Sequence, residues 1–369
     1  MYKPIRVLHV IGSMNRGGAE SMIMNLYRNI DREKVQFDFV ENTSEEAAFD
    51  QEILRLGGRI FRCPHYTGCN HFLYRKWWIR FLRDYGQDYS IVHGHLGSTA
   101  AIYLKIANRF GLFTIAHSHN TNLMQTKEDF LYAAVSFPVR YIADYFFACS
   151  QMAGKSRYGK KIASGNCYAL LNNAIDAKSF AYNQGERESW RDRFALGDSL
   201  VVGHIGRFNE QKNHRFLLEI FKEVQNLHGN AKLLLVGDGD LRKEIESRAE
   251  ELEIRDRIIF AGVRSEIPQI VQAMDVFLFP SLYEGLPVTL VEAQAAGLPC
   301  VISDRITREI MLTDLIRFCS LEEVPCEWAK CVLQAGKQAR RETTDEIISS
   351  GYDIRHTTEQ LTAFYLAHQ

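Results

Sequence analysis

Two glutamates separated by seven residues, Glu284 and Glu292, stand in a segment whose residue types could bind a phosphorylated polyol. The apolar run 276–279 before them is typical of a buried parallel strand. Pro287 suits the first residue of a helix and Gly297 the position after its end, so we predict a helix between them. Carboxylates accept hydrogen bonds from hydroxyl groups, and a helix N-terminus binds anions. Either glutamate alone would be an ordinary turn or surface residue, but the complete strand–turn–helix–strand unit favours a site.

Two cations, Arg207 and Lys212, lie on one loop that follows another short apolar run. A guanidinium and an ammonium group are the pair that would hold a diphosphate. Because the carboxyl ends of parallel strands share one edge of a sheet, we expect this loop and Glu284 at the same edge. Asp238 and Asp240 form a D-x-D pattern, which we interpret as a turn and helix cap and not as a metal site.

Four histidines end two neighbouring predicted strands: His93 with His95, and His117 with His119. Alternate residues of a strand point to the same face, as a metal site would require. No aspartate or glutamate lies in the same short segments, so we predict no metal here. We expect His117 or His119 to hydrogen-bond to a hydroxylated ligand, and for His93 and His95 a structural and a functional role are equally open.

Apolar runs alternate with helical segments along the whole chain, which predicts α/β architecture with doubly wound parallel sheets. The first strand, 5–11, leads into a loop where Gly17 and Gly18 open a helix; such glycines let backbone amides approach a phosphate, although they are common in βα turns. The length of 369 residues favours two domains, and the polar stretch 182–193 marks their boundary.

The composition excludes several classes of protein. A formal net charge of -1 gives no general attraction to nucleic acid, and the eight cysteines include no C-x-x-C pair, so we expect reduced thiols and no zinc site. No segment approaches the roughly 20 apolar residues that span a bilayer, so we expect a soluble protein or one that at most lies on a membrane surface, and the cysteine pattern favours the cytoplasm. The basic, tryptophan-containing segment 72–83 could lie on a membrane surface; we favour a sheet-covering helix with Leu73, Trp77 and Phe81 on its apolar face.

Together the motifs resemble retaining glycosyltransferases of family 4, which have the GT-B fold, and within them the bacterial capsule and exopolysaccharide branch. The resemblance covers nearly the whole chain. It implies two Rossmann-like domains that face a cleft: residues 1–178 bind the acceptor, residues 179–352 bind the nucleotide-sugar donor, and a helix within 353–369 returns to the first domain. It rests on the E-x7-E of Glu284 and Glu292 and on blocks at 16–20, 173–176, 206–212 and 236–239.

The resemblance also implies roles for the matched residues. Glu284 would contact the hydroxyls of the donor sugar and Glu292 those of the ribose, while Arg207 and Lys212 would neutralise the departing diphosphate. His117 matches the family histidine near the reacting sugar. The other implied donor-binding residues are Gly17, Gly18, Val263, Arg264, Gly285, Leu286, Val288 and Thr289, and the acceptor-side candidates are Glu20 and His119.

The implied reaction is a metal-independent, cofactor-free, retaining transfer from a nucleotide diphosphate sugar, with a UDP-sugar favoured. Its acceptor would be a saccharide or polyprenyl-diphosphate-linked saccharide of surface polysaccharide biosynthesis, with peripheral contact at the inner face of the cytoplasmic membrane. Two alternatives stay open: another GT-B nucleotide-sugar enzyme, such as an epimerase or phosphorylase, and a non-catalytic sugar-nucleotide-binding partner. The chain departs from the family at Ala174, where glycine is common, and at 305–315, which lacks a glycine-rich stretch.

Overall fold

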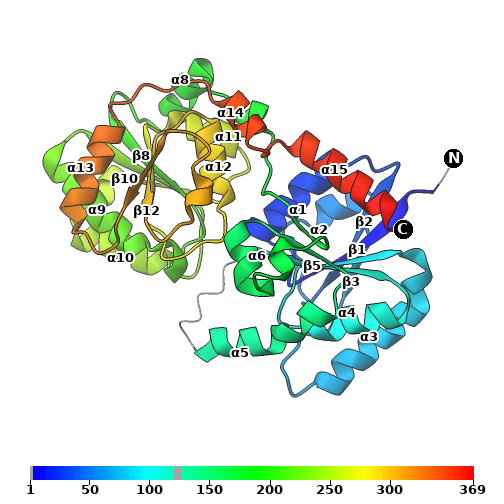
Figure 1. Cartoon of the computed structure of the whole chain (residues 1–369). Helices are drawn as coiled ribbons and strands as arrows, with labels where there is room; N and C mark the ends of the chain where they lie inside the picture. Colours follow the sequence, from blue (N-terminus) through cyan, green and yellow to red (C-terminus); the bar gives the residue numbers. More distant parts are fainter. Residues whose placement is uncertain (1–2, 120–126) are drawn as a thin grey trace. The chain divides into compact units, whose positions relative to one another are not determined.

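The computed structural model describes residues 3–119 and 127–369, and it divides into two compact units (Figure 1). The N-terminal unit comprises Met1–Ala174 together with Ile354–Gln369, and the C-terminal unit comprises Ile175–Asp353. The division after Ala174 falls a few residues before the predicted 178/179. The last helix belongs to the N-terminal unit, as the resemblance implies.

The N-terminal unit is built on a seven-stranded sheet in which every neighbouring pair is parallel, in the order β3-β2-β1-β4-β5-β6-β7. The order reverses direction at β1, as in doubly wound sheets that bind ligands at the carboxyl ends of their strands. The predicted α/β class is confirmed. The strands are β1 Ile5–Ile11, β2 Val35–Glu41, β3 Ile60–Arg62, β4 Ile91–Gly94, β5 Phe113–Ser118, β6 Tyr145–Ala148 and β7 Tyr168–Leu170.

Helices cover both faces of this sheet and bury a separate core on each. On one face α3 and α4 bring in Trp78 and Tyr103; on the other α1 and α15 bring in Tyr27 and Tyr365, all fully buried. Helix α15 packs beside α1 (Figure 1). The helices are α1 Gly18–Asn29, α2 Asp50–Arg55, α3 His71–Tyr85, α4 Ala100–Arg109, α5 Lys127–Ser136, α6 Gln151–Tyr158 and α15 Ile354–Ala367.

The face that α3 buries differs from the predicted one. The structure buries Tyr74, Trp78 and Phe81, whereas Leu73 is 58% exposed. The prediction was therefore wrong for Leu73, whereas Phe81 is buried and Trp77 packs, half-buried, against the core. Trp78 is the fully buried tryptophan; both tryptophans fit a helical stripe, and the sequence does not say which of them faces the sheet. Among the described residues, none of the helices has the length and apolar character needed to cross a bilayer.

The C-terminal unit repeats the architecture with six parallel strands in the order β10-β9-β8-β11-β12-β13. Its core packs α9 and α13 against the sheet around Phe221 and Trp328. The strands are β8 Leu200–Ile205, β9 Ala231–Val236, β10 Ile258–Gly262, β11 Val276–Phe279, β12 Cys300–Ser303 and β13 Ile316–Cys319. The helices are α7 Ala177–Phe180, α8 Gln184–Arg193, α9 His214–Leu227, α10 Arg242–Glu251, α11 Ile267–Ile270, α12 Val288–Ala295, α13 Pro325–Ala335 and α14 Thr344–Ser349.

Candidate functional site

The loops after β8 and β11 meet at the carboxyl edge of the C-terminal sheet. Lys212 ends a short 3-10 turn in the first loop, and its Nζ donates to Oε1 of Glu284 in the second at 2.7 Å. The two side chains are 15% and 9% exposed, and the ammonium lies 4.5 Å from the centre of the Phe279 ring. A charge pair held this close to an aromatic face is largely desolvated, which strengthens its interaction with any further charge that binds beside it.

Backbone hydrogen bonds fix the two loops to each other. The Leu282 amide donates to the carbonyl of Gln211 at 2.9 Å, and the Gln211 side chain donates to the carbonyl of Tyr283 at 2.9 Å. Asn213 adopts a left-handed backbone, φ 54°, which asparagine tolerates, and donates to the Pro280 carbonyl. The position of Glu284 relative to Lys212 is therefore set by main-chain contacts and not by the ion pair alone.

Helix α12 begins directly after this loop with its N-terminus uncapped by a side chain. Pro287 precedes the first helical residue, with an extended ψ of 120°, so our prediction placed it one residue too far into the helix. Gly297 has the predicted left-handed backbone, φ 64°. Gly285, Leu286 and Val288 are buried beside the helix start, and the buried Thr289 hydroxyl has no partner among the described residues. Uncapped amides and this hydroxyl are suited to an anion.

Glu292 stands on α12, half-buried, in surroundings that disfavour its charge. Burial raises the pKa of its carboxyl from 4.5 to about 7. Hydrogen bonds donated by a bound ligand would favour the ionised form and lower that pKa again. Glu284 is thus paired with a lysine, whereas burial favours the protonated form of Glu292.

Arg207 lies on the same β8 loop and reaches toward the β9 loop, where its Nη2 donates to Asp240 at 3.1 Å. Both side chains are well exposed, at 62% and 82%. Asp238 accepts from the Gly239 amide at 2.8 Å. Asp238 thus serves the turn, as we predicted, whereas the predicted helix cap was wrong: Leu241 precedes α10, whose N-terminus has no side-chain cap.

The backbones of the β8 and β9 loops touch so closely that only glycine fits between them. A Cβ on Gly237 would lie 2.0 Å from the carbonyl oxygen of Gly206, and the φ of Gly237 is 134°. A Cβ on Gly239 would lie 2.4 Å from the carbonyl oxygen of Phe208, whose amide donates to Asp238. This contact positions the loop that carries Arg207.

We expect Gly237→Ala to destabilise the C-terminal unit by about 2–4 kcal/mol, since the change adds backbone strain to a steric clash. Urea unfolding measures the loss. Gly229→Ala is the matched control, because Gly229 has no heavy atom near the added Cβ. Equal stability of the two variants would show that the β8 and β9 loops can separate without cost.

Val263 and Arg264 lie on the loop after β10, which is separated from β11 by β9 and β8 in the sheet. Val263 is 53% exposed, and Arg264 donates through Nε to the carbonyl of Ala261 at 2.8 Å. The structure therefore places these two candidates at the same carboxyl edge as Lys212, at some distance along it.

In the N-terminal unit, Gly17 and Gly18 stand at the start of α1 as predicted. Gly17 precedes the helix with an extended backbone, and a Cβ there would lie 2.3 Å from Oε2 of Glu20. Glu20 thus folds back over the start of its own helix, and burial raises the pKa of its carboxyl. A Cβ on Gly18 would meet no heavy atom within 4 Å.

The four predicted histidines come together near the carboxyl edge of the N-terminal sheet, and a fifth joins them. His93 Nε2 lies 3.2 Å from His117 Nδ1, and His95 Nδ1 lies 2.8 Å from His119 Nε2. His9 on β1, which sequence reasoning missed, places its Nδ1 2.9 Å from His95 Nε2. Its signal was a polar residue inside the apolar run 7–11 of β1.

Burial lowers the pKa of each of these five imidazoles, so all are neutral near pH 7. Two sets of three, His9–His93–His95 and His95–His117–His119, bring one nitrogen from each ring within 4.8 Å of one another. That is close enough for a shared cation, and the absence of a metal stays a prediction.

Two more histidines that sequence reasoning missed lie beneath Lys212. His204 on β8 and His214 at the start of α9 are buried, and burial lowers the pKa of each. His204 Nδ1 bonds to the Leu278 carbonyl at 2.9 Å, whereas its Nε2 and both His214 nitrogens lack partners among the described residues. These neutral rings add no positive charge under the ammonium.

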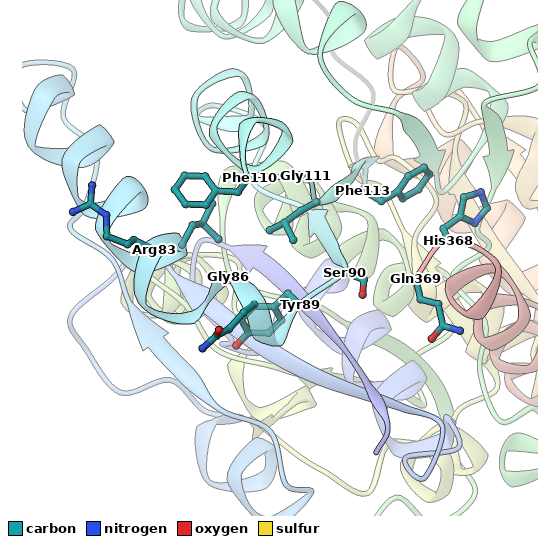
Figure 2. A pocket seen from close by; sticks show the side chains of 12 residues that line it. Arg83, Gly86, Tyr89, Ser90, Phe110, Gly111, Phe113, His368 and Gln369 are labelled. Atoms are coloured by element: carbon teal, nitrogen blue, oxygen red, sulfur yellow. The ribbon is translucent and has the colours of Figure 1, made fainter. Parts of the chain in front are cut away.

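A pocket of about 600 Å³ lies at the amino edge of the N-terminal sheet, opposite to the carboxyl edge that carries the histidine cluster (Figure 2). Ser90 and Phe113 stand at the amino ends of β4 and β5, and Figure 2 shows them with Phe110 and His368 around the opening. His93 and His117 of the histidine cluster lie toward the carboxyl ends of these two strands. The pocket therefore takes no part in the candidate site.

Two glycosyltransferase family models match this chain, one in each half. Residues 16–156 match Glycosyltransferase Family 4, and residues 186–313 match Glycosyl transferases group 1. The EpsF protein of Bacillus subtilis, whose name describes it as a glycosyltransferase, is 36% identical over 98% of this chain and 96% of its own length. The capsular polysaccharide biosynthesis glycosyltransferase CapH of Staphylococcus aureus is 25% identical over 98% of this chain and 99% of its own.

A shorter match and a solved structure complete the comparison. The Escherichia coli UDP-Gal:alpha-D-GlcNAc-diphosphoundecaprenol alpha-1,3-galactosyltransferase is 28% identical over 59% of this chain and 58% of its own. Anabaena HepE, solved with UDP-glucose, superimposes with a TM-score of 0.80 at 17% identity, covering 99% of this chain and 100% of HepE. That likeness shows the GT-B fold. The chain therefore belongs to the glycosyltransferases of family 4.

Proposed function

We propose that the chain transfers a sugar from a UDP-sugar to a saccharide or lipid-linked saccharide acceptor, with retention of the anomeric configuration. The observation that carries this proposal is the buried Lys212–Glu284 pair beside the uncapped start of α12. A cation, a sugar-orienting carboxylate and free helix amides converge there. That combination suits a sugar joined to a diphosphate.

In the proposed reaction each charged group has one task. Glu284 accepts hydrogen bonds from the donor sugar, and Glu292 accepts them from the ribose. The bond from the anomeric carbon to the diphosphate breaks while Lys212, Arg207 and the α12 amides stabilise the charge on the leaving oxygen. The acceptor hydroxyl attacks from the same face, and its proton passes to the departing diphosphate, so the configuration is retained.

We propose that this transfer needs no metal ion. Two cationic side chains are present to neutralise the diphosphate, while Asp238 accepts from the Gly239 amide and Asp240 pairs with Arg207. Activity should then persist in excess EDTA, and full loss of activity that Mg²⁺ or Mn²⁺ restores would contradict this part of the proposal.

The names of two similar proteins favour the choice of donor and acceptor. HepE was solved with UDP-glucose, and the Escherichia coli enzyme is named for UDP-galactose and a diphosphoundecaprenol-linked acceptor. A thermal-shift screen against UDP-, GDP- and dTDP-sugars tests the donor, because a ligand present at a hundred times its Kd stabilises the folded state by about 2.7 kcal/mol. A shift with GDP-sugars alone would contradict the choice of uridine.

Product analysis tests the transfer itself. With donor and a diphosphoundecaprenol-linked saccharide, the new glycosidic linkage should have the anomeric configuration of the donor, as read by NMR. Conversion of the donor without acceptor to an epimer would identify the epimerase alternative, and sugar phosphate formed from a glycoside the phosphorylase alternative. Donor binding without even slow hydrolysis would favour a non-catalytic partner.

Donor affinity should rise with pH if Glu292 binds the ribose. Its pKa of about 7 in the free protein falls when ribose hydroxyls donate to the carboxylate, so binding releases a proton around neutral pH. We expect the Kd for UDP-glucose to fall several-fold between pH 6 and pH 8, measured by calorimetry. The diphosphate of UDP-glucose, a diester, has no proton to lose in this range. A similar pH dependence in Glu292→Gln would remove Glu292 from the ribose site.

The same pKa predicts the sign of a stability effect. Because the folded state raises the pKa of Glu292, the folded chain holds more protons than the unfolded chain between about pH 4.5 and 7, and it loses stability as pH rises through that window. The stability of Glu292→Gln relative to the wild type should therefore improve by about 1–2 kcal/mol from pH 5 to pH 8. Glu41, whose pKa burial also raises to about 7, titrates in both proteins and cancels.

We also propose peripheral contact of the N-terminal unit with an anionic membrane, where a lipid-linked acceptor would be found. Helix α3 exposes Phe72 and Leu73, at 83% and 58%, next to the exposed cations Lys76 and Arg80. Apolar and basic side chains together are typical of interfacial helices. Co-sedimentation with phosphatidylglycerol vesicles should be lost in a Phe72→Ser/Leu73→Ser variant. Equal sedimentation of that variant would contradict the assignment of α3.

A further inference from the structure

A chain of hydrogen bonds links the C-terminal helix to His117 through the core of the N-terminal unit. The Tyr365 hydroxyl on α15 lies 2.7 Å from His93 Nδ1, and His93 Nε2 lies 3.2 Å from His117 Nδ1. All three side chains are buried, at 0%, 1% and 4% exposure. The far nitrogen of His117, Nε2, is buried and has no partner among the described residues.

The positions of the protons in this series of hydrogen bonds follow from the ionisation states of Tyr365 and the two histidines. Burial keeps the phenol of Tyr365 protonated by raising its pKa and keeps both imidazoles neutral by lowering theirs. Each neutral ring carries one N–H, so the direction of one hydrogen bond fixes all the others.

The phenol is the group that donates. An imidazole nitrogen is a better acceptor than a phenol oxygen, and 2.7 Å is the usual length for an O–H donor, whereas N–H donors lie nearer 2.9–3.0 Å. His93 is the one partner of the Tyr365 hydroxyl among the described residues, so an accepting phenol would leave its own O–H buried without a partner. His93 then carries its proton on Nε2 and donates to His117, whose proton must be on Nε2.

We propose that Tyr365 and His93 are positioning residues that hold His117 in its Nε2–H tautomer, so that His117 acts on the reacting sugar as a neutral hydrogen-bond donor. The action on the sugar rests on the proposed function; the tautomer does not. A fixed N–H at the carboxyl end of β5 is prepared for a ligand oxygen and cannot serve as a base.

The other three imidazoles lack such a fixed direction. His9, His95 and His119 form a second chain whose end nitrogens, His9 Nε2 and His119 Nδ1, have no partner in the described part of the protein. Among the described residues, no phenol or carboxylate hydrogen-bonds to either end, so both directions satisfy the same contacts. This difference explains why His117, and not His119, is the residue with an assigned tautomer.

The hydrogen bonds from Tyr365 through His93 to His117, which we call the relay, also favour a ligand oxygen over a metal ion as the partner of His117. A metal ligand must offer a lone pair, and His117 Nε2 could do so only if every hydrogen bond back to Tyr365 reversed. Ring positions agree with hydrogen bonding: the ring centres of His93 and His117 are 5.3 Å apart with planes at 20°, so their nitrogens, 3.2 Å apart, face each other nearly in line. Ligands that converge on one ion would instead meet at an angle.

Ring ¹⁵N spectra of ¹⁵N-histidine-labelled full-length protein test the tautomer directly, with the His117 signals assigned by loss in His117→Gln. We expect wild-type His117 to be protonated on Nε2 and not on Nδ1. Tyr365→Phe removes one oxygen and should give a mixture of tautomers, and kcat should fall roughly tenfold, the usual effect of losing an orienting partner, with little change in KM for the donor. His93→Phe should disturb the same signals by an independent break.

Tyr27→Phe is the matched control. Tyr27 is buried in the same core and loses an equivalent hydrogen bond, to Gln36 at 2.8 Å, without touching the relay. In Tyr27→Phe, the ring ¹⁵N signals of His117 and the kcat should match those of the wild type. The proposal is overturned if wild-type His117 is protonated on Nδ1, if Tyr365→Phe leaves its tautomer unchanged, or if added Zn²⁺ binds through its Nε2. A correct tautomer in a protein without transferase activity would uphold the relay and remove only the proposed function.

Discussion

A Lys212→Ala variant should turn over its donor at least about a hundredfold more slowly than the wild type, the usual cost of removing one preorganised group that stabilises developing charge. The effect has two sources. The diphosphate loses its most buried counter-charge, and the nearly buried carboxylate of Glu284 loses the lysine that pairs with it. We expect kcat to fall more than the affinity for the donor changes, because the charge on the leaving oxygen grows toward the transition state.

Three further variants, one of them a control, separate these sources. Lys212→Arg keeps the charge and should retain much more activity than Lys212→Ala, while Lys330→Ala removes an exposed lysine of α13 and should leave turnover unchanged. Adding Glu284→Gln to Lys212→Ala removes the negative charge of the Glu284 carboxylate. If that double variant recovers wild-type turnover, Lys212 serves only to neutralise Glu284 and has no part in the chemistry.

The edge of the C-terminal sheet could be predicted from sequence because its signals are local. The run 276–279, Gly297 and the loop glycines each report a conformation through their own residue type, and together they place Glu284 after a strand and before a helix. Strand β13 was missed, because Ile316–Cys319 alternates apolar and polar residues over only four positions and no turn glycine precedes it. The face of α3 was predicted only in part: Phe81 and Trp77 contact the core, but Leu73 is exposed, since two adjacent tryptophans leave the centre of the buried stripe undecided.

The relay in the N-terminal unit could not be predicted in the same way. Tyr365 and His93 are 272 positions apart, and no local pattern marks either as the partner of the other. The strand ends that carry His93 and His117 were visible, but His9 was hidden within an apolar run, where a lone polar residue is usually structural. Contacts between side chains of distant elements depend on the packing of α15 onto the sheet, which the sequence constrains only through its apolar stripe.

Arg207→Ala should reduce turnover on the order of a hundredfold or more, although the structure shows Arg207 as an exposed residue in a surface ion pair. Such a pair contributes little to stability, so the variant should unfold at nearly the same urea concentration as the wild type. A large kinetic loss without a loss of stability is the signature of a group that works only when substrate is bound. The side chain, 62% exposed and held by a single aspartate, can exchange that partner for a diphosphate oxygen at low cost.

Asp240→Asn is the variant that decides the meaning of this result. It removes the charge that pairs with Arg207 in the free protein while leaving the guanidinium in place. If Arg207 binds the diphosphate, the asparagine variant should keep near-normal turnover and bind the donor somewhat more tightly, because no competing carboxylate must be displaced. Near-normal turnover in Arg207→Ala, or an equal loss in both variants, would show that the pair merely shapes the β8 and β9 loops, and Lys212 would then stand alone as the cation for the leaving group.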